Sequence, residues 1–222
     1  MDNAYIFQHV DHTLLSPTAT WGDISLLCKE AILYQTACVC IAPIYVAPVF
    51  KEFGHSLPIC TVVGFPLGYN KTASKLAETE IALREGAKEI DMVINITDVK
   101  NGAFDNITSQ IKALKALCGK QILKVIIETC YLNQEEKVRL CGCITEAGAD
   151  FIKTSTGFGT KGATFADVTL FKEHIGANVQ IKAAGGIRTR EDMLAYLNLG
   201  VSRLGTSSAV KILQEEEHAQ GY

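Results

Sequence analysis

The stretch Glu146-Ala147-Gly148-Ala149-Asp150-Phe151-Ile152-Lys153 contains a helix end, a short turn and the start of a strand. Gly148 stands where helices commonly end, because glycine adopts the left-handed backbone conformation easily. The same pattern returns at 84–95 and at 198–205, each time with a glycine before a short apolar run. Repeated helix-to-strand connections with short turns are typical of βα units and predict a parallel sheet.

Extension of this pattern along the chain predicts alternating strands and helices. The strands are expected near 9–15, 37–41, 59–63, 89–95, 122–129, 151–154, 180–183 and 203–205. The helices are expected near 21–34, 46–53, 71–85, 105–118, 134–147, 165–174, 190–199 and 207–217. Eight βα units without a linker predict a single (β/α)8 barrel domain that spans residues 1–222. An open doubly wound sheet is the alternative, disfavoured because no G-x-G-x-x-G motif lies near the first strand.

The helices expected at 71–85 and 134–147 have the clearest amphipathic period. In the first of them, one face carries Ala73, Leu76, Ala77, Glu80 and Ile81. We expect this face to pack against the sheet.

The composition excludes several classes of function. With 21 basic and 24 acidic residues the formal net charge is −3, and no basic stripe with aromatic residues suggests nucleic acid binding. The first residues, Met1-Asp2-Asn3, do not resemble a secretory signal, and the apolar runs are too short to span a bilayer. We therefore expect a cytoplasmic protein without nucleic acid or membrane partners.

The eight cysteines do not predict disulfides or a metal site. The pairs Cys38/Cys40 and Cys141/Cys143 are C-x-C motifs without a neighbouring histidine, and the chain has no C-x-x-C motif. We expect the cysteines to be small buried hydrophobic residues.

Two lysines lie in apolar runs that glycine closes, in Phe151-Ile152-Lys153-Thr154-Ser155-Thr156-Gly157 and in Gln180-Ile181-Lys182-Ala183-Ala184-Gly185-Gly186. A lysine on a buried strand is costly unless it is paired, deprotonated or used in chemistry. If Lys153 and Lys182 converge, each cation disfavours the charge of the other, and one amine can be neutral near pH 7. A neutral lysine amine attacks carbonyl groups to form a Schiff base.

Asp91 interrupts the apolar run Ile90-Asp91-Met92-Val93-Ile94 on another expected strand. A buried carboxylate there needs a cationic partner. A structural salt bridge to a barrel lysine is one interpretation, and a role in proton transfer is the one that we favour.

Glycines and small hydroxyl residues follow the last three expected strands. Backbone N–H groups of such turns, together with a helix N-terminus, form anion sites, and barrels of this kind often bind phosphate after strands seven and eight. The candidate phosphate-binding residues are Gly157, Gly185, Gly186, Ser207 and Ser208.

Five segments together resemble the deoxyribose-phosphate aldolase family over essentially the whole chain. They are Asp11-His12-Thr13-Leu14-Leu15, Glu89-Ile90-Asp91-Met92-Val93-Ile94-Asn95, Lys124-Val125-Ile126-Ile127-Glu128-Thr129, and the runs that contain Lys153 and Lys182. The resemblance is to the short bacterial members of this class I aldolase family, and it implies reversible cleavage of 2-deoxy-D-ribose 5-phosphate. It implies that Lys153 forms the imine, that Asp91 and Lys182 transfer protons, and that Gly157, Gly185, Gly186, Ser207 and Ser208 contact the phosphate. It implies no metal or other cofactor, and it suggests a homodimer.

Three positions leave alternatives open. Phe158 stands where other members carry a lysine, so a phosphate contact from that position is in doubt. Lys161 either replaces that contact or is an ordinary solvated lysine. Tyr222, the last residue, either assists proton transfer at the site or has no role.

Two other functions remain open at this point. One is a metal-free lyase or isomerase barrel for another sugar phosphate. The other is a phosphate-binding barrel without catalytic activity.

Overall fold

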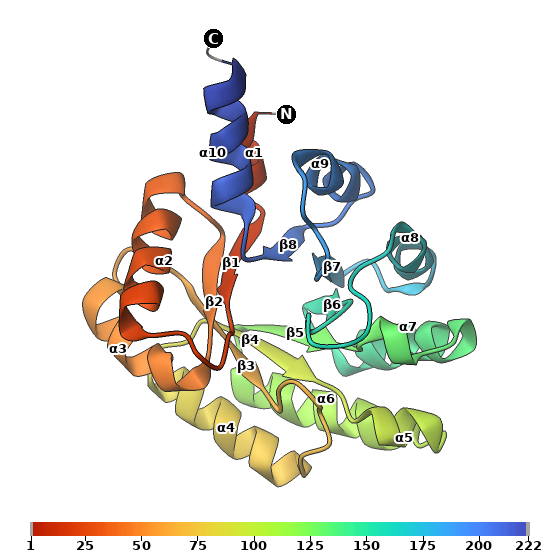
Figure 1. Ribbon diagram of the computed structural model, residues 1–222. Coiled ribbons are helices and arrows are strands. Elements are labelled where there is room, and N and C mark those ends of the chain that lie inside the picture. Colours follow the sequence, from red (N-terminus) through yellow and green to blue (C-terminus); the bar gives the residue numbers. More distant parts are fainter. Residues whose placement is uncertain (1, 221–222) are drawn as a thin grey trace.

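The computed structural model describes residues 2–220, with side chains through Gln214, and shows a closed parallel barrel of eight strands in chain order (Figure 1). Pairing of Val10 with Leu204 joins the last strand to the first. The (β/α)8 fold expected from the sequence is therefore confirmed. The strands are β1 (Val10–Leu14), β2 (Cys38–Ile41), β3 (Ile59–Val63), β4 (Glu89–Val93), β5 (Ile122–Ile126), β6 (Phe151–Lys153), β7 (Gln180–Ala184) and β8 (Arg203–Thr206).

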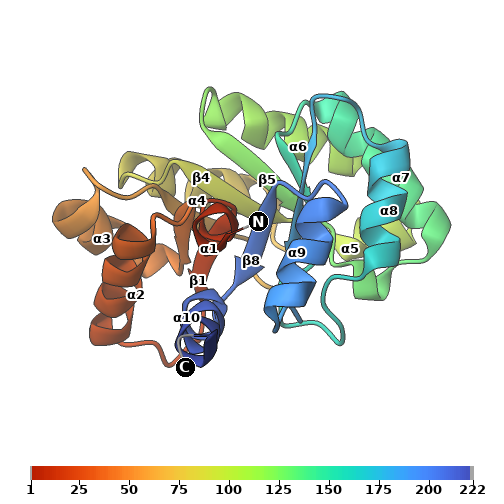
Figure 2. The same cartoon turned by 90° about the horizontal axis from the view of Figure 1, so that it is seen from above.

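Helices surround the barrel, as the view from above shows (Figure 2). One long helix follows each strand: α2 (Trp21–Tyr34), α3 (Val46–Phe53), α4 (Thr72–Arg84), α6 (Phe104–Cys118), α7 (Gln134–Ala147), α8 (Phe165–His174), α9 (Arg190–Asn198) and α10 (Ala209–Gln220). None of the described helices is both long and apolar enough to cross a bilayer. The cytoplasmic location stays a prediction from the sequence.

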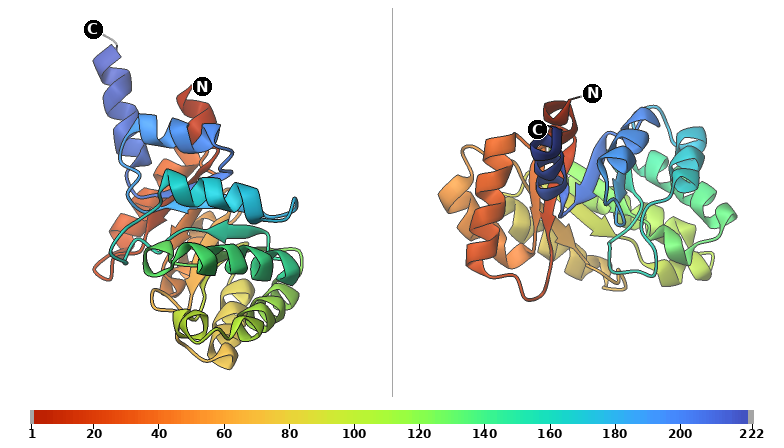
Figure 3. Two further views of the ribbon diagram at one scale, coloured as in Figure 1. Left: turned by 90° about the vertical axis from the view of Figure 1, so that its right-hand side faces the viewer. Right: turned by 45° about the horizontal axis from the view of Figure 1, so that its top comes forward.

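The sequence did not predict two short helices, α1 (Asn3–Phe7) and α5 (Ile96–Lys100). Asp2 caps α1 by accepting a hydrogen bond from the Tyr5 backbone N–H at 2.8 Å. The side chain of Asn3 donates to the carbonyl oxygen of Leu213 at 3.2 Å, which ties α1 to α10. The first and last described helices, α1 and α10, accordingly lie at the same end of the molecule (Figure 3).

Two strands end two or three residues before the predicted position, whereas the other strand ends differ by at most one residue. β4 stops at Val93, because Asn95 caps α5 by accepting from the Thr97 backbone N–H at 3.1 Å. β5 stops at Ile126, because the backbone of Glu128 turns into the left-handed region. The last helix begins at Ala209, two residues later than expected.

The buried face expected for α4 is only partly correct, because Leu76 packs against the core but its neighbours on that face do not. Ala73, Ala77 and Ile81 are exposed, whereas Lys75 and Thr79 are buried. The Lys75 ammonium donates to the Val93 carbonyl oxygen at 2.7 Å and to Gln110 Oε1 at 2.8 Å, so polar contacts decide which face packs inward.

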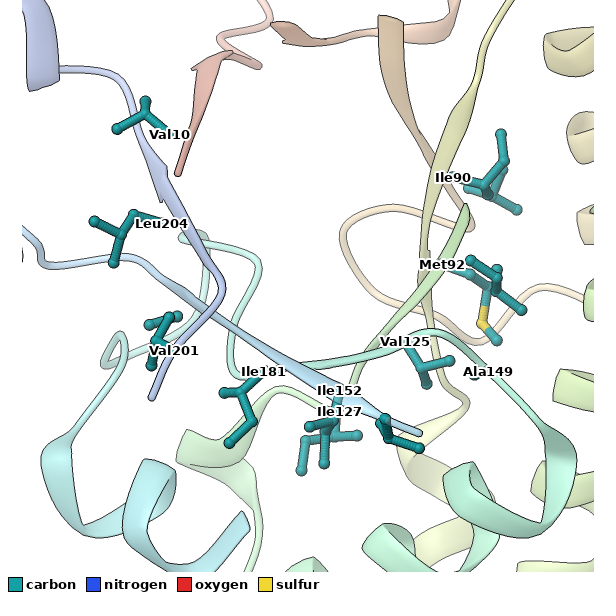
Figure 4. Packing of buried hydrophobic residues seen from close by; sticks show 14 of the residues in the cluster. Val10, Ile90, Met92, Val125, Ile127, Ala149, Ile152, Ile181, Val201 and Leu204 are labelled. Carbon is teal, nitrogen blue, oxygen red and sulfur yellow. The ribbon is translucent and has the colours of Figure 1, made fainter. Parts of the chain in front are cut away.

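The apolar core lies between the strands and the helices rather than inside the barrel. Side chains that point outward from neighbouring strands, such as Met92, Val125, Ile152 and Leu204, belong to one buried cluster (Figure 4). Because strand side chains alternate, the residues next to these point into the barrel. Those inward positions include the lysines and carboxylates that the sequence singled out.

Candidate active site

Strand register brings Lys153 and Lys182 together. They are directly paired on β6 and β7, so their side chains enter the barrel at the same level. Both ammonium groups donate to the same atom, Asp91 Oδ2, each at 2.7 Å. The convergence that the sequence predicted is therefore observed, with Asp91 between the two lysines.

A third lysine, which the sequence analysis did not assign to the site, completes the contacts of Asp91. Lys124 is fully buried and donates to Asp91 Oδ1 at 2.9 Å. Burial alone would raise the pKa of Asp91, but Lys124, Lys153 and Lys182 together hold it well below its usual range. Asp91 is thus a carboxylate throughout the physiological pH range.

Below this level a second group of charges fills the barrel. Lys182 is hydrogen-bonded to Asp11, and Lys124 lies 2.5 Å from Glu89. Arg203 reaches both carboxylates, with Nη1 at 2.5 Å from Asp11 Oδ1 and Nη2 at 2.8 Å from Glu89 Oε1. These two carboxylates and Asp91 are close to four cationic side chains, so the barrel interior is an ion-pair network.

The three lysines differ in their surroundings. Burial disfavours the charge of Lys182, but Asp11 and Asp91 more than offset it and raise the pKa of Lys182 well above its usual range. The same balance, with Asp11 and Asp91 as the leading partners, raises the pKa of Lys124. Both are fully buried, whereas Lys153 lines an open cavity. Of these three amines, Lys153 is the one that a substrate can reach.

The cavity has a volume of about 510 Å³ and lies at the carboxyl ends of the strands, within the loops that follow β1, β6, β7 and β8. All the predicted phosphate-binding residues line it: Gly157, Gly185, Gly186, Ser207 and Ser208. At Gly185 the backbone has a φ of +80°, and an added Cβ would lie 3.1 Å from Gly162 Cα. A side chain there would both strain the turn and crowd the opposite loop.

The structure also addresses the two doubtful cation positions. Phe158 lines the cavity and packs edge-on against Phe65, with ring centroids 5.3 Å apart. Lys161 is exposed and is not among the residues that line this cavity. Arg188 does line it, so the loop after β7 brings a cationic side chain to the cavity. Tyr222 lies outside the described residues.

The sequence analysis did not assign several charged residues to the site, although the sequence around one of them indicated a buried position. Lys124 interrupts the apolar run Ile122–Ile126 in the same way as Lys153 interrupts its own. Arg203 and Glu89 stand at strand starts, where charged residues usually reach solvent, so nothing in the sequence marked them as buried.

Cys38 and Cys40 of β2 and Cys60 and Val62 of β3 form a small buried cluster inside the barrel. The structure contains eight free cysteines, which agrees with the prediction of no disulfides. Cys60 is buried as expected, but it is not an inert hydrophobic residue. Its Sγ lies 3.1 Å from Asp91 Oδ1 and 3.2 Å from Lys124 Nζ. A thiol that donates to the carboxylate and accepts from the ammonium satisfies both contacts.

Two groups of ligand-type atoms within the barrel lie close enough together to contact one metal ion. One contains Asp11, Cys38, Cys60 and Glu89, and the other Cys40, Cys60 and Asp91. The carboxylates in both groups already accept hydrogen bonds from buried ammonium or guanidinium groups. A metal ion would have to displace these cations, so the donor set does not favour one.

Comparisons of the sequence and the structure with known proteins identify related aldolases. Residues 5–213 match the model of the DeoC/LacD family of aldolases. A deoxyribose-phosphate aldolase of Clostridium botulinum is 60% identical over 222 residues, which is 100% of both chains. One from Clostridioides difficile is 51% identical and aligns with 96% of this chain and 97% of its own. The solved tetrameric deoxyribose phosphate aldolase of Aeropyrum pernix superposes with a TM-score of 0.87 at 31% identity, over 98% of this chain and 93% of its own.

Proposed function

The chain belongs to the DeoC/LacD family of aldolases, and from this premise we propose that it cleaves 2-deoxy-D-ribose 5-phosphate reversibly. The products are D-glyceraldehyde 3-phosphate and acetaldehyde. The observation that carries the proposal is the position of Lys153, which lines the cavity while its ammonium group is hydrogen-bonded to Asp91. The names of relatives at 51–60% identity support the same substrate.

Imine formation begins the proposed reaction. Lys153 must lose a proton, and the Asp91 carboxylate at 2.7 Å is positioned to accept it or to pass it to water. The free amine attacks the aldehyde carbon of the open-chain sugar, and loss of water gives an iminium ion on Lys153. The positive iminium nitrogen then withdraws electrons from the bond between C2 and C3 of the sugar.

Bond cleavage and release need two further proton transfers. A base removes the proton of the C3 hydroxyl, the C2–C3 bond breaks, and the electron pair forms an enamine on Lys153. An acid then protonates C2, and water hydrolyses the imine to acetaldehyde and free lysine. We assign these transfers to Asp91 and Lys182 acting through water. Asp11 and Asp91 stabilise the charge of Lys182, so Lys182 is suited to the acid step, and Asp91 to the base step.

The phosphate group is proposed to lie at the other end of the cavity. Ser207 and Ser208 come directly before α10, whose first N–H groups lack partners within the helix and favour an anion. Arg188 adds a guanidinium, and the turns at Gly157 and Gly185 bring backbone close to the ligand. Recognition of the phosphate thus relies more on backbone groups than on charged side chains.

Trapping of the imine tests the proposal. The protein is incubated with acetaldehyde and sodium borohydride, digested, and searched by mass spectrometry for N-ethyl-lysine. We expect the adduct on Lys153, and its loss in Lys153→Leu. An adduct on Lys182, with Lys153 unmodified, would contradict the assignment.

We further propose that the chain forms a homodimer. Support comes from large apolar side chains exposed on neighbouring elements, namely Leu26 and Leu33 on α2 and Ile44 just before α3. Sedimentation velocity measures the mass directly. We expect a dimer that Leu33→Asp weakens, and a monomer at all concentrations would contradict the proposal.

A further inference from the structure

Glu128, directly after β5, has an unusual backbone conformation. Its φ is +50° and its ψ +69°, the left-handed region that non-glycine residues occupy at a cost of about 1–3 kcal/mol. Among the described residues, Gln35 is the other non-glycine residue with a positive φ, and it caps the end of α2, where this conformation is common. Glu128 does not end a helix, so its conformation needs another explanation.

The buried carboxylate of Glu128 supplies that explanation. Both of its oxygens accept from the Thr156 backbone N–H, at 3.2 and 3.3 Å, and Oε2 also accepts from the Thr156 hydroxyl. Thr156 Oγ1 in turn accepts from the Phe158 backbone N–H at 3.0 Å. These bonds form a chain from Glu128 through Thr156 to Phe158.

This chain ends on the wall of the cavity. Thr156, Gly157 and Phe158 line the cavity beside Lys153. No ion pair of the described residues includes Glu128, and its carboxyl oxygens are contacted by neutral donors, the backbone N–H and hydroxyl of Thr156 and, at 3.9 Å, Cys130 Sγ. A buried carboxyl group is costly unless its oxygens accept hydrogen bonds, and most of those that Glu128 accepts come from this turn.

The rest of the loop after β6 is also fixed. A Cβ at Gly159 would lie 2.7 Å from Cys130 Sγ and 3.1 Å from Glu128 Oε1, so the loop passes close to Glu128. At its far end the Ala163 backbone N–H donates to the carbonyl oxygens of Ala184 and Gly185, at 3.0 Å each. The turn at 156–158 is thus held by Glu128 on one side and by the end of β7 on the other.

We propose that Glu128 is a positioning residue that holds the Thr156-Gly157-Phe158 turn in the shape that recognises the substrate phosphate. This inference rests on the proposed function. Since Phe158 carries no charge, the turn can attract an anion only through its backbone. Its affinity for phosphate therefore depends on the direction of its N–H groups. Glu128 therefore contributes to the preference for phosphorylated over unphosphorylated sugar without contacting either.

The test compares two substrates that differ only in the phosphate. Glu128→Gln keeps the shape of the side chain but replaces one acceptor oxygen with an NH₂ group, which faces the Thr156 donors. We expect kcat/KM for 2-deoxyribose 5-phosphate to fall about tenfold, mainly through KM, as the loss of one hydrogen bond to a charged group predicts. The inhibition constant of inorganic phosphate should rise by a similar factor, whereas kcat/KM for 2-deoxyribose should change less than about twofold.

Variants of Thr156, which donates the hydrogen bonds to Glu128, test the same inference from the donor side. Thr156→Val removes the hydroxyl and should show the same selective loss, and it also serves if Glu128→Gln does not fold. Thr156→Ser keeps the donor and should restore phosphate selectivity. The matched control is Ser155→Ala, because the buried Ser155 hydroxyl has no hydrogen-bond partner among the described residues. In the double variant Glu128→Gln, Thr156→Val, kcat/KM for the sugar phosphate should fall no further than in the more affected single variant.

Equal losses with both substrates, or additive effects in the double variant, would overturn the inference and leave Glu128 a purely structural role. Failure of the proposed function gives a different result. In that case the wild-type protein does not cleave the sugar phosphate, while binding of inorganic phosphate, followed by calorimetry, still reports whether Glu128 shapes the anion site. Unchanged phosphate affinity in both single variants would also overturn the inference.

Discussion

Lys153 and Lys182 are register partners with a shared carboxylate, yet only one of them borders the cavity. The other is enclosed between Asp11 and Asp91, which stabilise its positive charge. At the scale of single residues this difference separates the proposed nucleophile from the lysine whose charge the carboxylates stabilise. The order of the two lysines along the chain does not reveal it.

Lys182→Met should separate imine formation from turnover. Without the ammonium group the proposed proton transfers lose a partner, and kcat should fall by about 10²-fold or more. Borohydride trapping with acetaldehyde should still modify Lys153. Lys182→Arg is the control that keeps the charge. Normal turnover in Lys182→Met would remove Lys182 from the mechanism.

Asp91→Asn should reduce both activity and stability. The amide no longer balances Lys124, Lys153 and Lys182, so we expect the free energy of unfolding to fall by about 3 kcal/mol or more. Turnover should fall by about 10²- to 10⁴-fold. Urea unfolding and steady-state kinetics measure the two effects separately. A variant with lower stability but near-normal turnover would show that Asp91 is only a structural ion-pair partner.

The sequence predicted these residues for a specific physical reason. A charged side chain within an apolar strand must be compensated, and Asp91, Lys153 and Lys182 all stand in such runs. Lys124 stands in one too and was predictable by the same argument. The backbone of Glu128 was not predictable, because its conformation depends on Thr156, which lies 28 residues further along the chain.

At the scale of elements, α4 shows where periodicity misleads. Small apolar residues marked one face, but the helix buries the face that carries Lys75, because this lysine satisfies the carbonyl oxygen at the end of β4 and a glutamine of α6. A long side chain with three donors can join three elements that a methyl group cannot reach. Hydrophobic pattern alone therefore could not identify the buried face.

The burial of Lys75 has a measurable consequence for stability. Burial lowers the pKa of Lys75 from 10.5 to about 8, although Asp98 and Glu78 act in the opposite direction. Between these two pH values the unfolded chain retains a proton that the folded protein has released, so stability rises with pH. Relative to Lys75→Met, wild-type stability should increase by up to about 3 kcal/mol from pH 8 to 10.5.

Urea unfolding of both proteins across this range measures the difference. Lys51→Met, at an exposed lysine of α3, is the control and should show no such trend. A constant difference between wild type and Lys75→Met would mean that Lys75 keeps its proton in the folded state.

At the scale of the whole molecule, the barrel has an unusual distribution of polarity. Apolar side chains fill the layer between strands and helices, whereas the interior contains a continuous ion-pair network from Glu89 and Arg203 up to Lys153. Each ion of such a network lacks the hydration that it had in water, so the removal of one partner leaves a buried charge uncompensated. The barrel therefore depends on the partners within the same network that we propose for the chemistry.

The balance of this network should set the pH range of stability. Burial opposes ionisation of Asp11 and Asp91, but the surrounding lysines, with Arg203 beside Asp11, lower both pKa values below the ordinary 3.8. The contribution of these two carboxylates to the free energy of unfolding is therefore complete above about pH 4. It is lost as the pH falls toward their pKa values in the folded protein. Lys124 and Lys182 have pKa values raised above 10.5, so their contribution is complete below that pH and is lost as the pH rises further.

We expect the contribution of this network to the free energy of unfolding to be constant between these limits and to decrease on either side, with the effect of Lys75 added to it. Urea unfolding from acid to alkaline pH measures it in the wild type and in Asp11→Asn. The variant has one carboxylate fewer that must be protonated in acid, so its stability should be lower between these limits and should fall less steeply below pH 4. Parallel curves for the two proteins would show that Asp11 gains no stability from its ionised form, and the network would then serve chemistry alone.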